Sequence, residues 1–114
     1  GWHVPSNAEW QILIDYLGGE DIAGSKLKEV GSEHWYCDKA NGTNEVGFCA
    51  LPGGFRDGNW DIFTNIRGGA NFWSSLDEDS GDNAWTFSLG CTSLDIKRTT
   101  SAKTCGLSIR CVKD

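Results

Sequence analysis

The stretch Gly47-Phe48-Cys49-Ala50-Leu51-Pro52-Gly53-Gly54-Phe55-Arg56 decides how this chain folds. Most of its side chains are apolar, but Pro52 and the Gly53-Gly54 pair interrupt them. Proline lacks a backbone N–H, and glycine readily adopts backbone angles that other residues avoid. The stretch therefore predicts a backbone that turns sharply inside a packed interior, rather than a regular helix or strand.

The residues before this stretch predict two helices. Ser6 and Glu9 have the spacing of a capping box, and Gly18-Gly19 is a stop signal. Between them, four apolar residues recur at helical spacing: Trp10, Leu13, Ile14 and Leu17. A second, shorter helix is expected from about Asp21 to Leu27.

The last third of the chain predicts three short antiparallel strands. Apolar and polar residues alternate over Trp85–Leu89, Leu94–Ile96 and Leu107–Cys111. The middle of the chain has no long periodic segment, although Asp57-Gly58 favours a small hairpin between Phe55 and Trp60. Helices followed by antiparallel strands predict an α+β domain.

Four sequence blocks resemble the Fibrobacter succinogenes major paralogous domain, which looks like a branch of the C-type-lectin-like superfamily. They are Gly1–Ser6, Gly47–Arg56, Phe72–Ser75 and Ser108–Asp114. The resemblance implies one C-type-lectin-like domain over residues 1–114, with two N-terminal helices, a long irregular loop region and a C-terminal antiparallel meander. Relatives commonly carry Cys-Pro and an extended segment upstream. The resemblance therefore also implies a fragment of a longer surface protein that lacks its N-terminal strand.

Charge and hydropathy exclude two classes of partner. Ten basic and sixteen acidic residues give a net charge of −6, and the basic residues do not cluster. Nucleic acid is therefore not an expected partner, because phosphate contacts need a concentrated positive patch. Membrane insertion is not expected either, because the longest apolar run near the N-terminus is Ile12–Ile14. A secreted or cell-surface protein fits this composition.

Five cysteines occur without paired C-x-x-C motifs, which disfavours a zinc knuckle and favours disulfides in an oxidising compartment. Sequence distance favours the pairs Cys37–Cys49 and Cys91–Cys105. Cys111 then stays unpaired or bonds another chain. In the resembling family its natural partner is the upstream cysteine.

An acidic loop is a candidate calcium site. Asp77, Asp79, Asp82 and Asn83 place hard oxygen ligands within a short segment, and calcium takes six to eight such ligands. The spacing is not that of an EF-hand. The alternative is a solvated acidic turn before a strand.

Three aromatic residues outside the periodic segments are candidate ligand-binding residues: Trp35, Tyr36 and Trp60. Flat rings on loops can stack on sugars or anchor protein partners. The alternative is that a small domain needs these rings in its core. Four other tryptophans are expected in the core: Trp2, Trp10, Trp73 and Trp85.

Isolated polar residues are expected to have structural roles. Arg56 and Arg110 should brace loop carbonyls or acidic neighbours, and the Asn44 side chain should bond backbone amides of a turn. His3 should bond the backbone, and two isolated histidines make neither a metal site nor a catalytic base. Because no catalytic constellation can be argued from spacing, the chain is not expected to be an enzyme.

These features favour a non-catalytic binding module of a secreted or cell-surface bacterial protein, which recognises glycan or protein ligands through loops between Trp35 and Asn83. The alternative is a structural or self-assembly domain of an adhesin or filament. An open edge at Leu107–Val112 predicts that a neighbouring subunit or a fragment of the same precursor pairs there.

Overall fold

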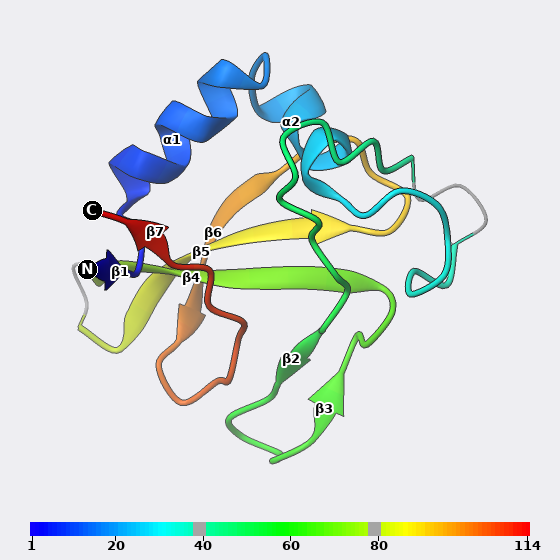
Figure 1. Ribbon diagram of the computed structural model, residues 1–114. Helices are drawn as coiled ribbons and strands as arrows, with labels where there is room; N and C mark the ends of the chain where they lie inside the picture. The colour runs from blue at the N-terminus through cyan, green and yellow to red at the C-terminus, as the bar shows by residue number, and fades with distance from the viewer. Residues whose placement is uncertain (38–40, 78–80) are drawn as a thin grey trace.

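A computed structural model describes residues 1–37, 41–77 and 81–114 of this α+β chain (Figure 1). Both helices lie on one side of the central sheet, and the two termini lie side by side. Within the described residues the elements are β1 (Trp2–His3), α1 (Asn7–Tyr16), α2 (Glu20–Leu27), β2 (Phe55–Arg56), β3 (Phe63–Thr64), β4 (Gly69–Asp77), β5 (Asn83–Gly90), β6 (Lys97–Ala102) and β7 (Val112–Lys113).

Both predicted helices are confirmed. Ser6 caps α1, its hydroxyl accepts from the Glu9 backbone N–H at 3.3 Å, and Glu9 Oε2 accepts from the Ser6 N–H at 2.9 Å. This is the capping box that the sequence predicts. Gly18 and Gly19 both have positive φ and end the helix. α2 begins at Glu20, one residue earlier than expected.

The central sheet is an antiparallel meander in the order β4-β5-β6. The predicted strand over Trp85–Leu89 lies within β5, but the other two strand predictions are wrong in position. β6 begins at Lys97, after the buried Ile96, and β4 was not predicted because glycine and serine obscure its alternation. Within residues 107–111, all of which the structure describes, strand pairing is limited to the isolated bridge from Ser108 to Phe72.

The two chain ends pair with each other. Trp2 lies opposite Lys113 and His3 lies opposite Val112, in antiparallel register. An open edge was expected at Leu107–Val112, but β1 pairs with the end of this segment, at Val112, within the chain. Trp2 was expected in the core and is instead exposed, because it lies on this short peripheral ribbon.

A second small ribbon joins β2 to β3 and projects from the body of the molecule (Figure 1). Phe55 pairs with Thr64 and Arg56 with Phe63. A hairpin that turns at Asp57-Gly58 is therefore confirmed, but its second strand begins three residues after Trp60. Arg56 braces the loop as expected, with Nε donating to Asp61 Oδ1 at 2.6 Å.

The Gly47–Arg56 stretch turns as the sequence predicts. Cys49 and Gly54 both have positive φ, and a Cβ at Gly54 would collide with the backbone carbonyl of Thr64. Asn44 Oδ1 accepts from the Cys49 backbone N–H at 2.6 Å, which confirms the predicted turn bond. Phe48 packs edge-on against Phe72, with ring centroids 5.5 Å apart.

Trp10 occupies the centre of the core. Its ring stacks on Phe87 at a centroid distance of 4.8 Å and lies 5.9 Å from both Phe48 and Phe72. Its burial agrees with the sequence expectation, whereas Trp73 and Trp85 are only half-buried. The first helix, the turning stretch and the sheet therefore share one apolar cluster.

The disulfide joins Cys37 to Cys91, with their Cα atoms 6.0 Å apart. Neither predicted pair, Cys37–Cys49 nor Cys91–Cys105, is present. Sequence distance fails here because tertiary hydrogen bonds hold both ends of the bridge near one segment. The Arg67 carbonyl accepts from Tyr36 N–H, and the Gly68 carbonyl accepts from Cys91 N–H.

The other three cysteines, Cys49, Cys105 and Cys111, are free thiols, as expected for Cys111. The Cys37–Cys91 bond indicates an extracytoplasmic location, because such bonds persist in oxidising compartments. In the described part of the chain, neither helix has the length and apolar character that a membrane span requires.

Candidate functional site

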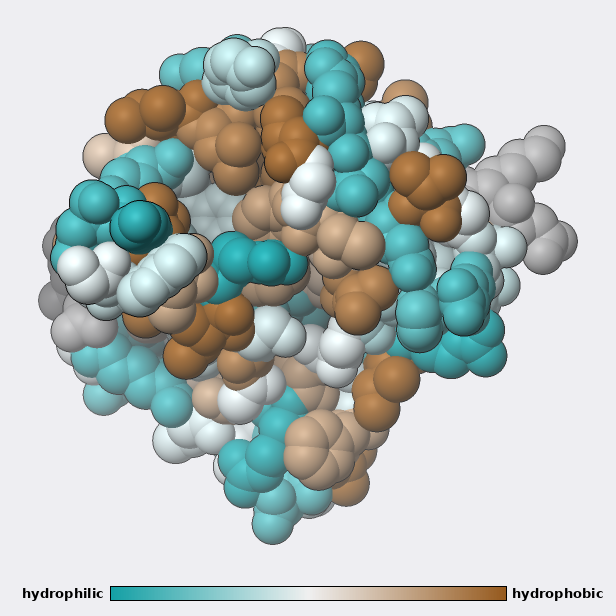
Figure 2. Space-filling model, in the orientation of Figure 1, coloured by the Kyte–Doolittle hydropathy of each residue, from teal (hydrophilic) through white to brown (hydrophobic). Residues whose placement is uncertain are grey.

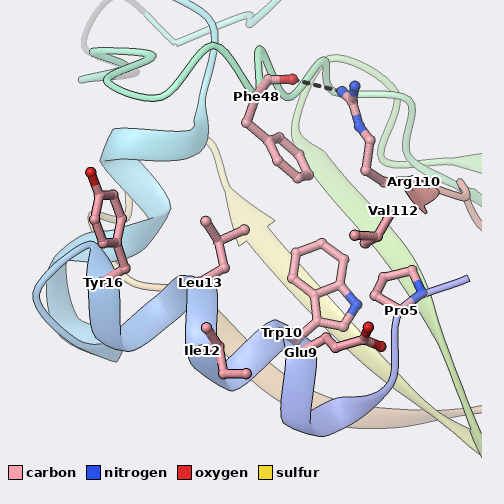
Figure 3. A pocket seen from close by; sticks show the side chains of 9 residues that line it. All are labelled: Pro5, Glu9, Trp10, Ile12, Leu13, Tyr16, Phe48, Arg110 and Val112. Atoms are coloured by element: carbon pink, nitrogen blue, oxygen red, sulfur yellow. Dashed lines mark hydrogen bonds between the residues drawn. The ribbon is translucent and has the colours of Figure 1, made fainter. Parts of the chain in front are cut away.

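An apolar cleft of about 400 Å³ opens between α1 and the C-terminal segment (Figure 3). α1 forms one wall, and Phe48 and residues 110–112 form the other. Figure 2 shows the hollow beneath α1, with apolar side chains around it. The residues that line it are Pro5, Glu9, Trp10, Ile12, Leu13, Tyr16, Phe48, Arg110 and Val112.

The helix places the apolar side chains of this wall. Ile12 and Tyr16 lie four residues apart and therefore share one face of α1. Both are exposed, although the neighbouring face of the same helix packs into the core through Trp10 and Ile14. A helix of this length normally exposes polar residues on its outer face, so these two side chains mark an unpartnered apolar surface.

Arg110 closes one end of the cleft. Its guanidinium donates to the Phe48 carbonyl at 2.7 Å and lies 4.4 Å above the Phe48 ring centroid. This confirms the prediction that Arg110 braces a loop carbonyl. The contact joins the turning stretch to the C-terminal segment, and Arg110 as a whole stays exposed beside the cleft.

Glu9 lies at the other end and is committed to contacts within the chain. The Ser6 backbone N–H, and then His3, lower the pKa of Glu9 to about 2, so it is a carboxylate at neutral pH. His3 Nε2 lies 2.7 Å from Glu9 Oε1, and His3 Nδ1 lies 2.7 Å from Asp114 Oδ1. The prediction that His3 bonds the backbone is therefore wrong.

The side chains that line the cleft are mostly apolar. Among the described residues that line it, none is a serine, cysteine or lysine nucleophile. The Glu9 carboxylate already contacts the Ser6 backbone N–H, the Ser6 hydroxyl and the His3 ring. The Arg110 guanidinium already donates a hydrogen bond to the Phe48 carbonyl. Apolar walls with few polar groups are typical of ligand sites.

The three aromatic residues expected to bind ligand do not form one site. Trp35 is fully buried beneath Lys28, whose ammonium lies 5.4 Å from its ring centroid, so the prediction for Trp35 is wrong. Tyr36 is 65% exposed and Trp60 is 75% exposed. In the described part of the chain these two rings do not contact each other.

The β2–β3 hairpin carries further exposed apolar side chains that the sequence reasoning missed. Ile62, Phe63 and Ile66 are all exposed, near the exposed Trp60. Their signal in the sequence is the spacing of apolar residues around polar ones over 60–67, which is weak because the segment is short and irregular. None of these residues lines the cleft beside α1.

The predicted calcium ligands are described in part. Asp77 ends β4, Asp82 is exposed and its carbonyl accepts from Lys103 N–H at 3.0 Å, and Asn83 begins β5. Asp79 lies outside the described residues. The calcium site therefore stays a prediction.

Residues 1–113 match the Fibrobacter succinogenes major domain family. The chain belongs to this family. No curated protein and no solved structure matches the chain, so the lectin-like fold stays a prediction on top of the observed α+β architecture.

In this Fibrobacter succinogenes major domain, three of the four sequence blocks line the cleft together with α1. The first supplies Pro5, the second supplies Phe48 and the last supplies Arg110 and Val112. The Phe72–Ser75 block supports the wall from beneath, because the Phe72 ring contacts Phe48. The segments that carry the family resemblance therefore contribute to the cleft, and α1 supplies the remaining residues that line it.

Proposed function

We propose that this domain is a non-catalytic binding module of a secreted or cell-surface protein. Its ligand is an apolar peptide segment of a protein partner, which lies in the cleft between α1 and residues 110–112. The observation that carries the proposal is the cleft itself, with its exposed wall of Ile12 and Tyr16. A neighbouring subunit of the same surface assembly is a partner of this kind.

The size and chemistry of the cleft favour a peptide over a sugar. A volume of about 400 Å³ lies within the range of small-ligand sites and accommodates one or two apolar side chains. A sugar presents many hydroxyl groups, which need hydrogen-bond partners when they are buried. The two charged residues of the cleft, Glu9 and Arg110, already have partners within the chain.

Backbone groups beside the cleft give a peptide a second means of attachment. In the described part of the chain, the backbone N–H groups of Arg110 and Cys111 donate no hydrogen bond, and both residues are exposed. Unpaired backbone next to a short strand can pair with an added extended segment. Such pairing supplies affinity, and the apolar walls supply selectivity for side chains.

A second candidate is glycan recognition at the β2–β3 loop. Trp60 is exposed at the loop, and the neighbouring Asp57 and Asn59 carry polar side chains that suit sugar hydroxyls. This loop is distant in sequence from the cleft residues. Variants of the two sites therefore separate the two functions.

The experiment selects short random peptides displayed on phage against the immobilised domain, with a glycan array probed in parallel. The proposal expects enriched peptides with apolar side chains, whose binding is lost with Ile12→Glu and retained with Ile22→Glu. Ile22 is a matched control, because it is also an exposed isoleucine on a helix but does not line the cleft. Glycan binding that is lost with Trp60→Ala, without selection of any peptide, would overturn the proposal.

A further inference from the structure

Glu29, Glu33 and His34 bring three metal-ligand atoms together in the segment that follows α2. Two carboxylate oxygens and one ring nitrogen all lie within 4.8 Å of one another. His34 Nδ1 lies 2.7 Å from Glu29 Oε1. Among the described residues, this group of one histidine and two glutamates has the spacing that a metal site requires.

The backbone of this segment is held by contacts with two other segments, at Ala50 and at Arg67. The Glu29 N–H donates to the Ala50 carbonyl at 3.2 Å, next to the bridge between Lys28 and Ala50. Arg67 Nε donates to the His34 carbonyl at 3.1 Å, and its Nη2 reaches the Glu33 carbonyl at 3.5 Å. The three ligand residues therefore stand on a positioned backbone rather than on a free loop.

The environment of the Glu29 carboxylate favours a bound cation. Its side chain is only 14% exposed, and its Oε2 is buried without a hydrogen-bond partner. A buried carboxylate oxygen without a donor is costly, because it loses its hydration and gains nothing in return. The nearby Lys28 ammonium does not compensate it, because that group donates to carbonyls of residues 90–93.

We propose that Glu29, Glu33 and His34 bind a divalent transition-metal ion, with zinc as the best fit. The imidazole nitrogen disfavours calcium and magnesium, which prefer oxygen ligands only. Zinc binds imidazole and carboxylate at about 2.0–2.2 Å and commonly leaves one position to water beside three protein ligands. Glu33 and His34 are exposed, so this open position faces solvent.

A bound zinc ion would give the Glu29 carboxylate the partner that its Oε2 lacks. The ion replaces the proton shared between His34 and Glu29, and it neutralises charge that two adjacent glutamates otherwise hold in one place. Ligand atoms around tetrahedral zinc lie about 3.3 Å apart at these bond lengths. His34 Nδ1 and Glu29 Oε1, now 2.7 Å apart, would therefore separate slightly, and the carboxylate of Glu33 would adjust its position within the present 4.8 Å limit. The exposed Glu33 and His34 can make this movement.

The test titrates zinc chloride into the whole chain by calorimetry, after chelator treatment. Cys49, Cys105 and Cys111 are replaced by serine, because free thiols also bind zinc. The proposal expects saturable binding of one ion per chain, weakened at least about tenfold by His34→Gln and by Glu29→Gln. Circular dichroism confirms that each variant is folded. Because His34 is exposed, its substitution keeps the test valid even where Glu29→Gln unfolds the chain.

Two controls identify the site. His3→Gln removes the other histidine, which contacts Glu9 and Asp114, and Asp82→Asn alters the acidic loop. Both should leave the affinity unchanged, and the ring protons of His34, not those of His3, should shift in the NMR spectrum. Binding that survives His34→Gln, binding that depends on His3 or Asp82, or the absence of saturable binding would each overturn the proposal.

Discussion

The imidazole of His3 lies 2.7 Å from the carboxylate of Glu9 and ties the N-terminal strand to the first turn of α1. The other ring nitrogen contacts Asp114, so one histidine joins both chain ends to the helix. Pro5, beside this contact, also lines the cleft. The position of α1 against the C-terminal segment therefore depends on a titratable contact.

This contact predicts that the free energy of unfolding depends on pH both above pH 6.5 and below pH 4.5. Hydrogen bonds with Asp114 and then Glu9 raise the pKa of His3 above 6.5. Its contribution is therefore full below pH 6.5 and is lost as pH rises through the raised value. The pKa of Glu9 is lowered from 4.5 to about 2, so its contribution is present above pH 4.5 and is lost as pH falls towards 2.

Urea midpoints measured across this range test the prediction. The native chain should lose stability above pH 6.5, and His3→Gln should remove that loss while keeping the decline at acid pH through the remaining Ser6–Glu9 bond. Equal profiles for the native chain and His3→Gln would contradict this role of His3.

The Cys37–Cys91 bond predicts a large loss of stability on removal. Its ends are 54 residues apart, and closing a loop of that length stabilises the native state by about 4 kcal/mol in the chain-entropy model. The double substitution to serine should lower the unfolding free energy by about that amount. Peptide mapping under denaturing conditions should recover the Cys37–Cys91 pair, and recovery of Cys37–Cys49 would contradict the structure.

Lys28 predicts a second stability effect close to the disulfide. Its buried ammonium donates to the carbonyls of Ser93 at 2.6 Å and Gly90 at 3.0 Å. Burial lowers the pKa of Lys28, and Asp95 opposes this shift. Lys28→Met keeps the shape of the side chain but leaves the carbonyls unpaired, so the unfolding free energy should fall by about 3 kcal/mol.

Lys26→Met is the matched control, because Lys26 makes only a partly exposed ion pair with Glu45. Denaturant unfolding should show a change below about 1 kcal/mol for this variant. A Lys28→Met variant as stable as the native chain would contradict the bracing role.

Local signals made much of the fold predictable. The capping box of Ser6, the helical spacing of Trp10 and the Gly18-Gly19 stop act within a few residues, so α1 follows from the sequence. Asn44 and the Gly47–Arg56 stretch were also interpreted correctly, because turn chemistry is local.

Long-range pairings were not predictable in the same way. The partner of Cys37 is set by hydrogen bonds around Arg67 and Gly68, far away in the sequence. β4 lacks clear alternation, and the burial of Trp35 depends on Lys28, which reads as an ordinary charged residue in the sequence. The cleft needs α1 and three separate sequence blocks to meet, and no single one of these segments indicates it.

Asn44 gives a test of the turn before Phe48. It has a φ of 47°, and its side chain bonds the Cys49 N–H. Both Asn44→Gly and Asn44→Ala remove the hydrogen bond. Glycine adopts the left-handed region without strain, whereas alanine keeps a Cβ there and lacks the local side-chain bond that lets asparagine tolerate it. The glycine variant should lose about 1 kcal/mol and the alanine variant about 2 kcal/mol, measured by denaturant unfolding. Equal losses would contradict the backbone argument.

The most direct measurement of the binding proposal is an NMR titration of the labelled domain with a phage-selected peptide. The account predicts that backbone amide shifts concentrate at α1, Phe48 and residues 110–113, and that Ile12→Glu abolishes them while Ile22→Glu does not. Shifts that concentrate at Trp60 and the β2–β3 hairpin, and that persist in Ile12→Glu, would contradict the account.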